Sequence, residues 1–377
     1  VYSLATDASS TANVGTYPIT GTALDANYTI TFVNGTYTIT KAPAVATAPT
    51  AVSGLIYNTA PQTLIATGST NDGNIVYSLE KEGTYTADLP QAMDVGTYTV
   101  WYQVEADSNH TASAAPASVT VEIKKANASV DAPAAISGLV YNGREQTLVI
   151  PVESMDGTVY YSLDGVTYTD YVPKGINAQE YTVYYKVVGD ANHNDMEPKT
   201  VTAKIAPWNI ETASCKAGVR GGPFTYNGQE HTPTPQIDVW VNDYPVPGNP
   251  YAPGADVRLT KDTDYTVAYS NNVNAGQAVV TFTGKGNYTG TITRKFTIAP
   301  KPITVTIADK TSVYGEAVAE LTAATDGIVN NDTNVYSLAT TATSTANAGT
   351  YPITGTTLDN NYAITFVNGT YTITKAP

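Results

Sequence analysis

The chain has 377 residues, of which 42% are hydrophobic and 14% charged, and its net charge is −14. This length accommodates about two to four domains, each able to bury a core. The acidic balance disfavours nucleic acid and anionic membranes as partners. The single cysteine, Cys215, excludes an intrachain disulfide.

The aromatic residues are mainly tyrosine, with 28 Tyr against 5 Phe, and Thr and Val occur throughout. β-Branched and aromatic side chains suit the pleated surface of a sheet and fit helices poorly. Composition therefore predicts an all-β chain.

The opening segment 1–43 recurs at 335–377 and differs from that copy at only six positions. A copy at a fixed offset indicates an array of modules. Segment 1–43 lacks a counterpart of residues 301–334, so we expect it to be the C-terminal half of a module. Its apolar side chains should be less buried than those of the copy: Tyr17, Ile19, Tyr28, Ile30 and Phe32 against Tyr351, Ile353, Tyr362, Ile364 and Phe366.

Within 1–43, apolar and Thr residues alternate around Tyr17, around Tyr28 and around Tyr37. Period-2 alternation predicts three half-buried strands. Asn34-Gly35 stands between the last two runs, and this pair favours a type I′ hairpin.

Four longer segments follow and share their order of motifs, which places module boundaries near residues 43, 126, 206 and 300. Segments 44–126 and 127–206 share Ser-Gly-Leu-x-Tyr-Asn near their starts and Tyr-Ser-Leu later. Segment 207–300 is longer and has a Pro- and Gly-rich insertion at 244–254. Segment 301–377 contains the copy of the opening segment, and residues 317–330 could form a helical turn or two.

Short strands separated by turn residues in modules of this size predict antiparallel β-sandwiches. We therefore expect a linear tandem array of small antiparallel β-sandwich modules.

Segment 301–377 contains Val-Tyr-Gly-Glu at 313–316, Asn-Asn-Asp-Thr at 330–333 and Ala-Gly-Thr-Tyr at 348–351. In these motifs it resembles the MBG family of bacterial surface-protein repeats. Segment 207–300 is similar to the Ig-like repeats of Gram-positive cell-surface proteins, through Tyr-Asn-Gly-Gln-Glu at 226–230 and Gly-Asn-Tyr-Thr-Gly at 286–290. The two middle modules resemble Ig-like repeats less tightly. The resemblance implies Ig-like and MBG-like folds, an extracellular location and a place in the stalk of a large adhesin.

Catalysis is not expected. The three histidines (His110, His193 and His231) fall in different modules, and two of them occupy a turn position where other modules have Tyr. Cys215 has no histidine near it in sequence, so a buried or incidental thiol is the simpler interpretation.

An Asp-x-Asn turn recurs late in four modules, and its acidic members are Asp25, Asp107, Asp190 and Asp359. Oxygen ligands at this spacing could bind Ca²⁺, which needs six or more of them. The alternative is that Asp and Asn cap their own turn. Turn capping is favoured, and no cofactor is expected.

A few large side chains fall out of phase with the predicted core. In the strand after Gly96 the inward phase leaves Trp101 outward, and the same phase leaves Tyr160 and Tyr184 outward in the next module. Val76 is expected to lie beside Trp101 on the outer face. Outward aromatics suit sugar stacking, whereas the alternative is packing beneath a loop or a neighbouring module.

Two functions therefore stay open. One is a mechanical spacer in a surface adhesin, and the other is a glycan- or mucin-binding module that uses Trp101, Tyr160 and Tyr184. The partners expected are neighbouring copies of the protein, through its incomplete N-terminal module, and a host or cell-wall glycan.

Overall fold

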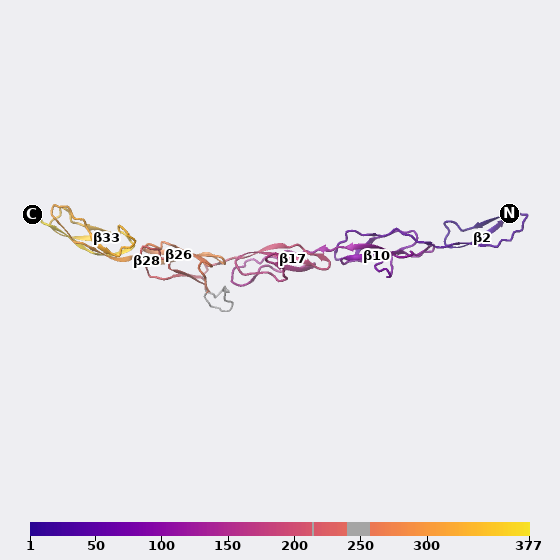
Figure 1. Cartoon of the computed structure of the whole chain (residues 1–377), viewed down its shortest axis with the longest axis horizontal. Coiled ribbons are helices and arrows are strands. Elements are labelled where there is room, and N and C mark those ends of the chain that lie inside the picture. Colours follow the sequence, from indigo (N-terminus) through magenta and orange to yellow (C-terminus); the bar gives the residue numbers. More distant parts are fainter. Residues whose placement is uncertain (213–214, 240–256) are drawn as a thin grey trace. The chain divides into compact units, whose positions relative to one another are not determined.

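The computed structural model describes residues 1–212, 215–239 and 257–377. The predicted insertion at 244–254 lies outside the described residues. The described chain consists of strands, turns and irregular segments without a helix (Figure 1), so the all-β prediction is confirmed.

The chain divides into two compact units. The first contains Val1–Pro133, Pro151–Tyr171 and Tyr184–Val201, and the second contains Ala134–Ile150, Val172–Val183 and Thr202–Pro377. Because the division crosses 127–206, the module boundaries stay a prediction. The segment ranges are kept below as names.

Segment 1–43 forms one three-stranded sheet in the order β1 (Tyr2–Thr6), β2 (Gly15–Ala23), β3 (Gly35–Ile39). Both pairings are antiparallel, with Tyr17 opposite Tyr37. The runs around Tyr17 and Tyr37 are strands as predicted, whereas the run around Tyr28 is irregular. The strand β1 was not predicted.

The predicted Asn34-Gly35 hairpin is wrong, and the copy at 335–377 shows why. There β34 (Tyr362–Val367) and β35 (Gly369–Thr374) follow each other but belong to different sheets. Neither Asn368 nor Gly369 has a positive φ, which a type I′ turn requires. The Asn-Gly pair marks a crossing between two sheets.

Segment 301–377 is a sandwich of two sheets. One has the order β31 (Ala323–Asp326), β29 (Lys301–Ile307), β34, and the other has the order β30 (Lys310–Val313), β35, β33 (Gly349–Thr357), β32 (Tyr336–Thr340). Fully buried Val305, Ile353 and Tyr371 come from both sheets. Residues 317–330 contain β31 and no helix.

Strand β34 pairs in parallel with β29, a strand that 1–43 does not contain. The missing partner explains why the run around Tyr28 is not a strand. Tyr28 is 58% exposed whereas Tyr362 is 3% exposed, and Ile19 is half-buried whereas Ile353 is fully buried. The other three pairs compared above are half-buried in both copies.

Segment 44–126 has a main antiparallel sheet of β12 (Ala117–Ile123), β10 (Gly96–Val104) and β8 (Ile75–Ser78). Two short pairs join β5 (Thr50–Ala51) to β7 (Ile65–Ala66) and β6 (Gln62–Thr63) to β9 (Gln91–Ala92). The core contains Leu64, Ile65, Tyr77, Val100, Val121 and Ile123. Alternate residues of β10 and β12 therefore face one core, as the period-2 pattern predicts.

Segment 127–206 repeats this plan with β15 (Gly157–Ser162), β17 (Gln179–Gly189) and β19 (Lys199–Ile205) in one sheet. A short pair joins β14 (Gln146–Thr147) to β16 (Lys174–Gly175). Val183, Tyr185 and Val187 of β17 are buried, so this strand has the same inward phase as β10.

Segment 207–300 has a four-stranded sheet in the order β22 (Phe224–Thr225), β28 (Thr291–Ala299), β26 (Gly276–Gly284), β25 (Tyr265–Ser270). A second sheet has the order β21 (Cys215–Arg220), β23 (Thr234–Val239), β24 (Val257–Arg258). Buried Cys215, Ile237 and Phe282 share one core. The sheets are thus a sandwich, with the thiol packed inside it.

Three two-residue linker strands and the seven-residue β29 each pair in parallel with a late strand of the segment that they lead into. These pairs are β4 (Ala42–Pro43) with β11 (His110–Thr111), β13 (Ala126–Asn127) with β18 (His193–Asn194), β20 (Trp208–Asn209) with β27 (Tyr288–Thr289), and β29 with β34. The linkers therefore belong to the sheets and add parallel pairs to the predicted antiparallel ones.

Candidate functional site

The Asp-x-Asn turn is built by its own acidic side chain. In segment 127–206 the N–H of Asn192 donates to Asp190 Oδ1 at 2.8 Å. The same bond recurs at Asp25–Asn27 (2.9 Å), Asp107–Asn109 (2.7 Å) and Asp359–Asn361 (2.8 Å). Segment 207–300 has Lys285 in place of Asp, and its turn closes through the N–H of Tyr288 to the Lys285 carbonyl at 3.2 Å. Because the turn is closed from within, the Asn side chain is free to point outward.

That Asn side chain holds the preceding segment. The N–H of Val95 donates to Asn192 Oδ1 at 3.0 Å, and Asn192 Nδ2 donates to Asp94 Oδ1 at 3.1 Å. The carboxamide of Asn offers an acceptor and a donor side by side, whereas an ionised Asp in its place would have no donor for the second bond. We call this pair of hydrogen bonds the Asn clasp.

The Asn clasp recurs at four joints between consecutive segments. In every case the backbone N–H that donates and the side-chain oxygen that accepts belong to neighbouring residues. At each of the other three joints, one distance runs from a backbone N–H to Asn Oδ1 and the other from Asn Nδ2 to a side-chain oxygen. The two distances are 3.0 and 3.0 Å for Asn109 with Val14 and Asn13, 2.7 and 3.2 Å for Asn287 with Ala178 and Asn177, and 2.8 and 3.4 Å for Asn361 with Ala275 and Asn274. The joints at Asn109 and Asn192 lie in the first compact unit, and those at Asn287 and Asn361 lie in the second.

The linker adds a third bond to each clasp. Its backbone N–H donates to the backbone carbonyl of the clasp Asn. The donors are Ala42 to Asn109 (3.1 Å), Ala126 to Asn192 (3.1 Å), Trp208 to Asn287 (2.9 Å) and Lys301 to Asn361 (2.8 Å). The linker cannot swing freely while this bond and the clasp are both made.

A ring contact completes three of the joints. The Tyr of the early Tyr-Asn or Thr-Tyr-Asn motif meets the ring of the residue after the clasp Asn, edge to face. The pairs are Tyr57 with His193 (centroids 5.2 Å apart), Tyr141 with Tyr288 (5.5 Å) and Tyr226 with Tyr362 (5.5 Å). Such contacts stabilise the packing beyond the area that they bury.

Asp332 ties the last of these ring pairs to segment 301–377. The hydroxyls of Tyr226 and Tyr362 donate to Asp332 Oδ2 at 2.8 and 2.6 Å. Burial, followed by the bond to Asp332, raises the pKa of both tyrosines. Both phenols therefore stay protonated and keep donating at physiological pH.

Two histidines occupy the turn position predicted for them and bridge two aspartates each. His110 Nδ1 lies 3.0 Å from Asp107 Oδ1, and its Nε2 lies 3.6 Å from Asp72 Oδ1. In the next segment His193 makes the corresponding contacts to Asp190 at 2.7 Å and Asp156 at 3.6 Å. The hydrogen bond from the histidine lowers the pKa of Asp107 and of Asp190.

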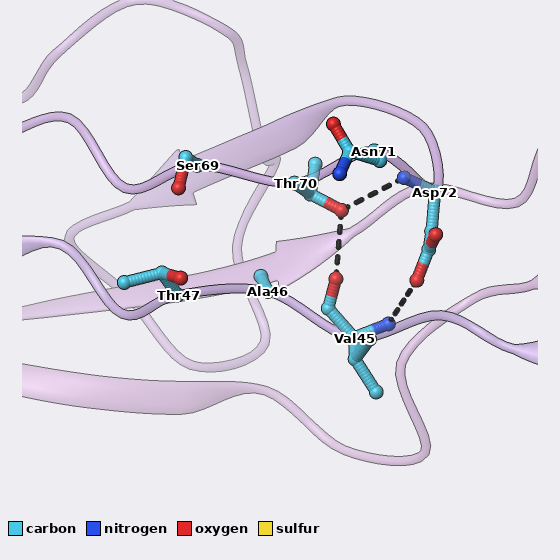
Figure 2. A pocket seen from close by; sticks show the side chains of 7 residues that line it. All are labelled: Val45, Ala46, Thr47, Ser69, Thr70, Asn71 and Asp72. Atoms are coloured by element: carbon cyan, nitrogen blue, oxygen red, sulfur yellow. Dashed lines mark hydrogen bonds between the residues drawn. The ribbon is translucent and has the colours of Figure 1, made fainter.

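Asp72 also lines an open recess beside the first joint (Figure 2). The N–H of Val45 donates to Asp72 Oδ2 at 2.9 Å, and Thr70 Oγ1 donates to the Val45 carbonyl at 2.7 Å. The recess is lined by Val45, Ala46, Thr47, Ser69, Thr70, Asn71 and Asp72. Segment 127–206 repeats this arrangement, with Ser129 N–H to Asp156 Oδ2 at 2.8 Å and Ser154 Oγ to the Ser129 carbonyl at 2.8 Å. A recess whose polar groups serve recurring turns favours a structural role.

The third histidine and the cysteine stand apart from these groups. The His231 ring lies 5.4 Å from that of Phe224, and its buried Nε2 has no hydrogen-bond partner among the described residues. Burial raises the pKa of Cys215 to about 12, which suppresses the reactive thiolate.

The calcium candidates Asp25, Asp107, Asp190 and Asp359 all accept the turn hydrogen bonds described above. No group of three or more His, Cys, Asp or Glu side chains within the described ranges could hold a metal ion. The geometry thus supports the turn-capping interpretation, and Ca²⁺ binding stays an untested alternative.

The predicted outward aromatics are half-buried. Trp101 has Lys81 Nζ 5.5 Å from its ring centroid. Tyr184 packs beneath the turn that contains Gly165, where a Cβ added to the glycine would lie 3.2 Å from the tyrosine ring. Tyr160 pairs with Lys186 and lies diagonal to Tyr184 across the neighbouring strands β15 and β17. Both tyrosines share one face, and packing beneath a turn accounts for the ring of Tyr184.

The prediction that Val76 faces outward is wrong. Val76 is 3% exposed and the following Tyr77 is 4% exposed. Strand β8 is covered on both faces, so alternation cannot tell its two sides apart. The residue opposite Val76 is Gln103, and Trp101 is opposite Ser78.

The Asn clasp was missed at the sequence level. For the Asn of the late turn the sequence predicts only turn capping or, as the alternative, Ca²⁺ binding. It predicts no role for the pairs Asn13–Val14, Asp94–Val95, Asn177–Ala178 and Asn274–Ala275. The signal was available as an Asn or Asp followed by Val or Ala just before the long central strand of each segment.

In the comparison with known protein families, one family model matches both ends of the chain. The model of the MBG domain (YGX type) matches residues 1–38 and 303–372. No curated protein matches the chain. A protocadherin gamma B2 structure of extracellular cadherin domains 1–5 matches 97% of this chain and 86% of its own, at 9% identity and a TM-score of 0.19. At this TM-score the likeness does not establish a shared arrangement.

No helix in the described residues is long and apolar enough to cross a membrane. The chain carries MBG-type sequence at both of its ends, matched across 303–372 and only in part within 1–43.

Proposed function

We propose that this chain is a spacer segment of a large extracellular surface adhesin, in which clasped β-modules hold a binding region away from the cell. The observation that supports it best is the recurrence of the Asn clasp at four joints. MBG-type sequence at both ends supports an adhesin-type repeat protein. The bacterial cell surface as its location belongs to the same proposal.

A spacer needs joints that resist bending, and three kinds of contact supply this here. Each joint has two clasp hydrogen bonds and one linker bond, and three joints add a ring contact. A typical hydrogen bond contributes about 0.5–1.5 kcal/mol net. Several such bonds at one joint favour a fixed arrangement over a freely jointed one.

A role without catalysis is part of this proposal. His110 and His193 are engaged with aspartates that close recurring turns, and the thiol of Cys215 is held protonated by burial. These groups therefore have structural partners or surroundings that account for them.

The spacer proposal is tested by placing a reporter binding domain on a cell surface above zero, two or four of these segments. The measurement is capture of beads that carry the reporter's ligand, at equal surface expression. Capture should rise with the number of segments, because each adds reach. Capture that is independent of segment number would contradict a spacer.

The same chains without the reporter test the competing glycan-binding proposal. They are applied to immobilised host and cell-wall glycans. Binding that is lost in Trp101→Ala and Tyr184→Ala chains of unchanged melting temperature would replace the spacer by a binding module. The spacer proposal expects no binding in any of these chains.

A further inference from the structure

The accepting half of an Asn clasp also exists in segment 301–377, where no described residue contributes a clasp Asn. The residues are Asn347 and Ala348, which occupy the position of Asn13 and Val14 in the repeated sequence. Both are exposed. With Tyr314 they form what we call the open acceptor.

The backbone of the open acceptor already has the shape seen at occupied joints. The hydroxyl of Tyr351 donates to the Asn347 carbonyl at 2.8 Å. The same bond holds three of the four occupied acceptors, from Tyr17 to Asn13 (2.6 Å), from Tyr98 to Asp94 (2.7 Å) and from Tyr181 to Asn177 (2.8 Å). The acceptor therefore needs no rearrangement before it binds an Asn side chain.

Tyr314 stands where the other segments have the tyrosine of the joint ring contact. Its N–H donates to the Thr374 carbonyl, at the end of the closing strand, at 2.9 Å. The corresponding bonds run from Tyr57 to Lys124 (2.9 Å), from Tyr141 to Ala206 (2.8 Å) and from Tyr226 to Ala299 (2.9 Å). Tyr314 is 47% exposed, whereas Tyr226, which has a ring partner, is 4% exposed.

We propose that Tyr314, Asn347 and Ala348 form a docking site for the Asp-x-Asn-aromatic turn of a further β-module, of the 44–126 type, joined through Lys375-Ala376-Pro377. This proposal rests on the joint geometry alone and goes beyond the spacer function, so either can fail without the other.

The nearly identical copy indicates the kind of module. Asn13 and Val14 form the clasp with Asn109 of segment 44–126. The one difference in this pair, Ala348 for Val14, is harmless because the backbone N–H groups of Ala178 and Ala275 donate to a clasp Asn elsewhere. The ring after the clasp Asn, His110 in this module, would lie against Tyr314 as His193 lies against Tyr57.

The linker favours a covalently joined module over a second copy of the chain. Ala42 donates to the backbone carbonyl of Asn109, and Lys41 Nζ donates to the Asp107 carbonyl at 2.6 Å. Residues 375–377 repeat Lys41-Ala42-Pro43 and would make both bonds to a module that they lead into. A short linker raises the effective concentration to the order of millimolar, which a separate chain does not have.

The test extends the whole chain by residues 44–126 placed directly after Pro377 and measures amide hydrogen exchange. We expect exchange at Ala348 to slow by about fivefold or more relative to the unextended chain, as for a newly made hydrogen bond. Val14, clasped in both chains, is the internal control and should not change. Replacing Asn109 by Ala in the added module alone should restore fast exchange at Ala348.

Three results would overturn the proposal. One is exchange at Ala348 that the extension leaves unchanged while Val14 stays protected. Another is concentration-dependent association of unextended chains, removed by Asn347→Ala, which would make a second copy the occupant. Slowed exchange that survives Asn109→Ala in the added module would also count against it, because the clasp would not be its cause.

Discussion

At the scale of single residues, the clasp depends on one carboxamide. In Asn192→Ala the N–H of Val95 and the side chain of Asp94 lose their partners. Two hydrogen bonds correspond to about 1–2 kcal/mol of coupling between the segments, since both partners are part-exposed. Hydrogen exchange at Val95 should accelerate accordingly, while the fold of each segment is retained.

Asn27→Ala is the matched control for that substitution. Asn27 is in the same Asp-x-Asn turn, and its side chain has no hydrogen-bond partner among the described residues. Its loss should leave exchange at the other joints unchanged. If Asn192→Ala has no more effect on Val95 than Asn27→Ala has, the clasp contributes nothing to the joint.

A second residue-scale prediction concerns pH. Asp164 accepts bonds from the Ser162 hydroxyl and from the N–H groups of Val166 and Thr167, and these bonds lower its pKa from 3.8 to about 2. A lowered pKa stabilises the folded state above the unfolded value of 3.8, and this stabilisation is lost as the pH falls through about 2.

The measurement compares exchange at Val166 and Thr167 in the native chain and in Asp164→Asn between pH 5 and 2. The native turn should be the better protected at pH 5, and the difference should shrink steadily towards pH 2. A difference that is constant over this range would show that the charge of Asp164 does not stabilise the turn.

At the scale of elements, segment 1–43 lacks the strand that would order the run around Tyr28. Placing residues 301–334 before Val1 supplies a second β29. Residues 28–33 should then form a parallel strand with slowed hydrogen exchange, and Tyr28 should become buried like Tyr362. The same extension with Pro in place of Val305 is the control, because proline disrupts a central strand. Equal ordering by both extensions would contradict the pairing.

Local patterns predicted most strands because alternation reports a face buried in one core. The runs around Tyr17, Val100 and Val183 are strands with the predicted phase. The pattern failed at β8, which is covered on both faces. It also failed at Asn34-Gly35, because a turn propensity does not say which sheet the next strand joins. The clasp could not be predicted for a related reason: its two halves are about 90 to 110 residues apart in sequence, and neither is unusual alone.

At the scale of the whole molecule, cooperativity between segments is expected to differ along the chain. One buried cluster of the second compact unit contains Ala278, Phe296 and Ile298 of segment 207–300 together with Val305 and further residues of segment 301–377. The core of segment 44–126, in contrast, contains residues of that segment alone. Segments 207–300 and 301–377 should therefore unfold as one unit.

Ile298 and Ile123 make a matched pair for testing this, since both are fully buried in the closing strand of their segment. Truncation of a buried Ile to Ala costs about 2–5 kcal/mol. Hydrogen exchange in increasing denaturant should show that Ile298→Ala lowers the unfolding midpoint of segments 207–300 and 301–377 together. Ile123→Ala should lower the midpoint of segment 44–126 and leave those two unchanged. If Ile298→Ala destabilises segment 207–300 while the amides of 301–377 keep their midpoint, the shared cluster does not couple the two segments, and the chain unfolds one segment at a time.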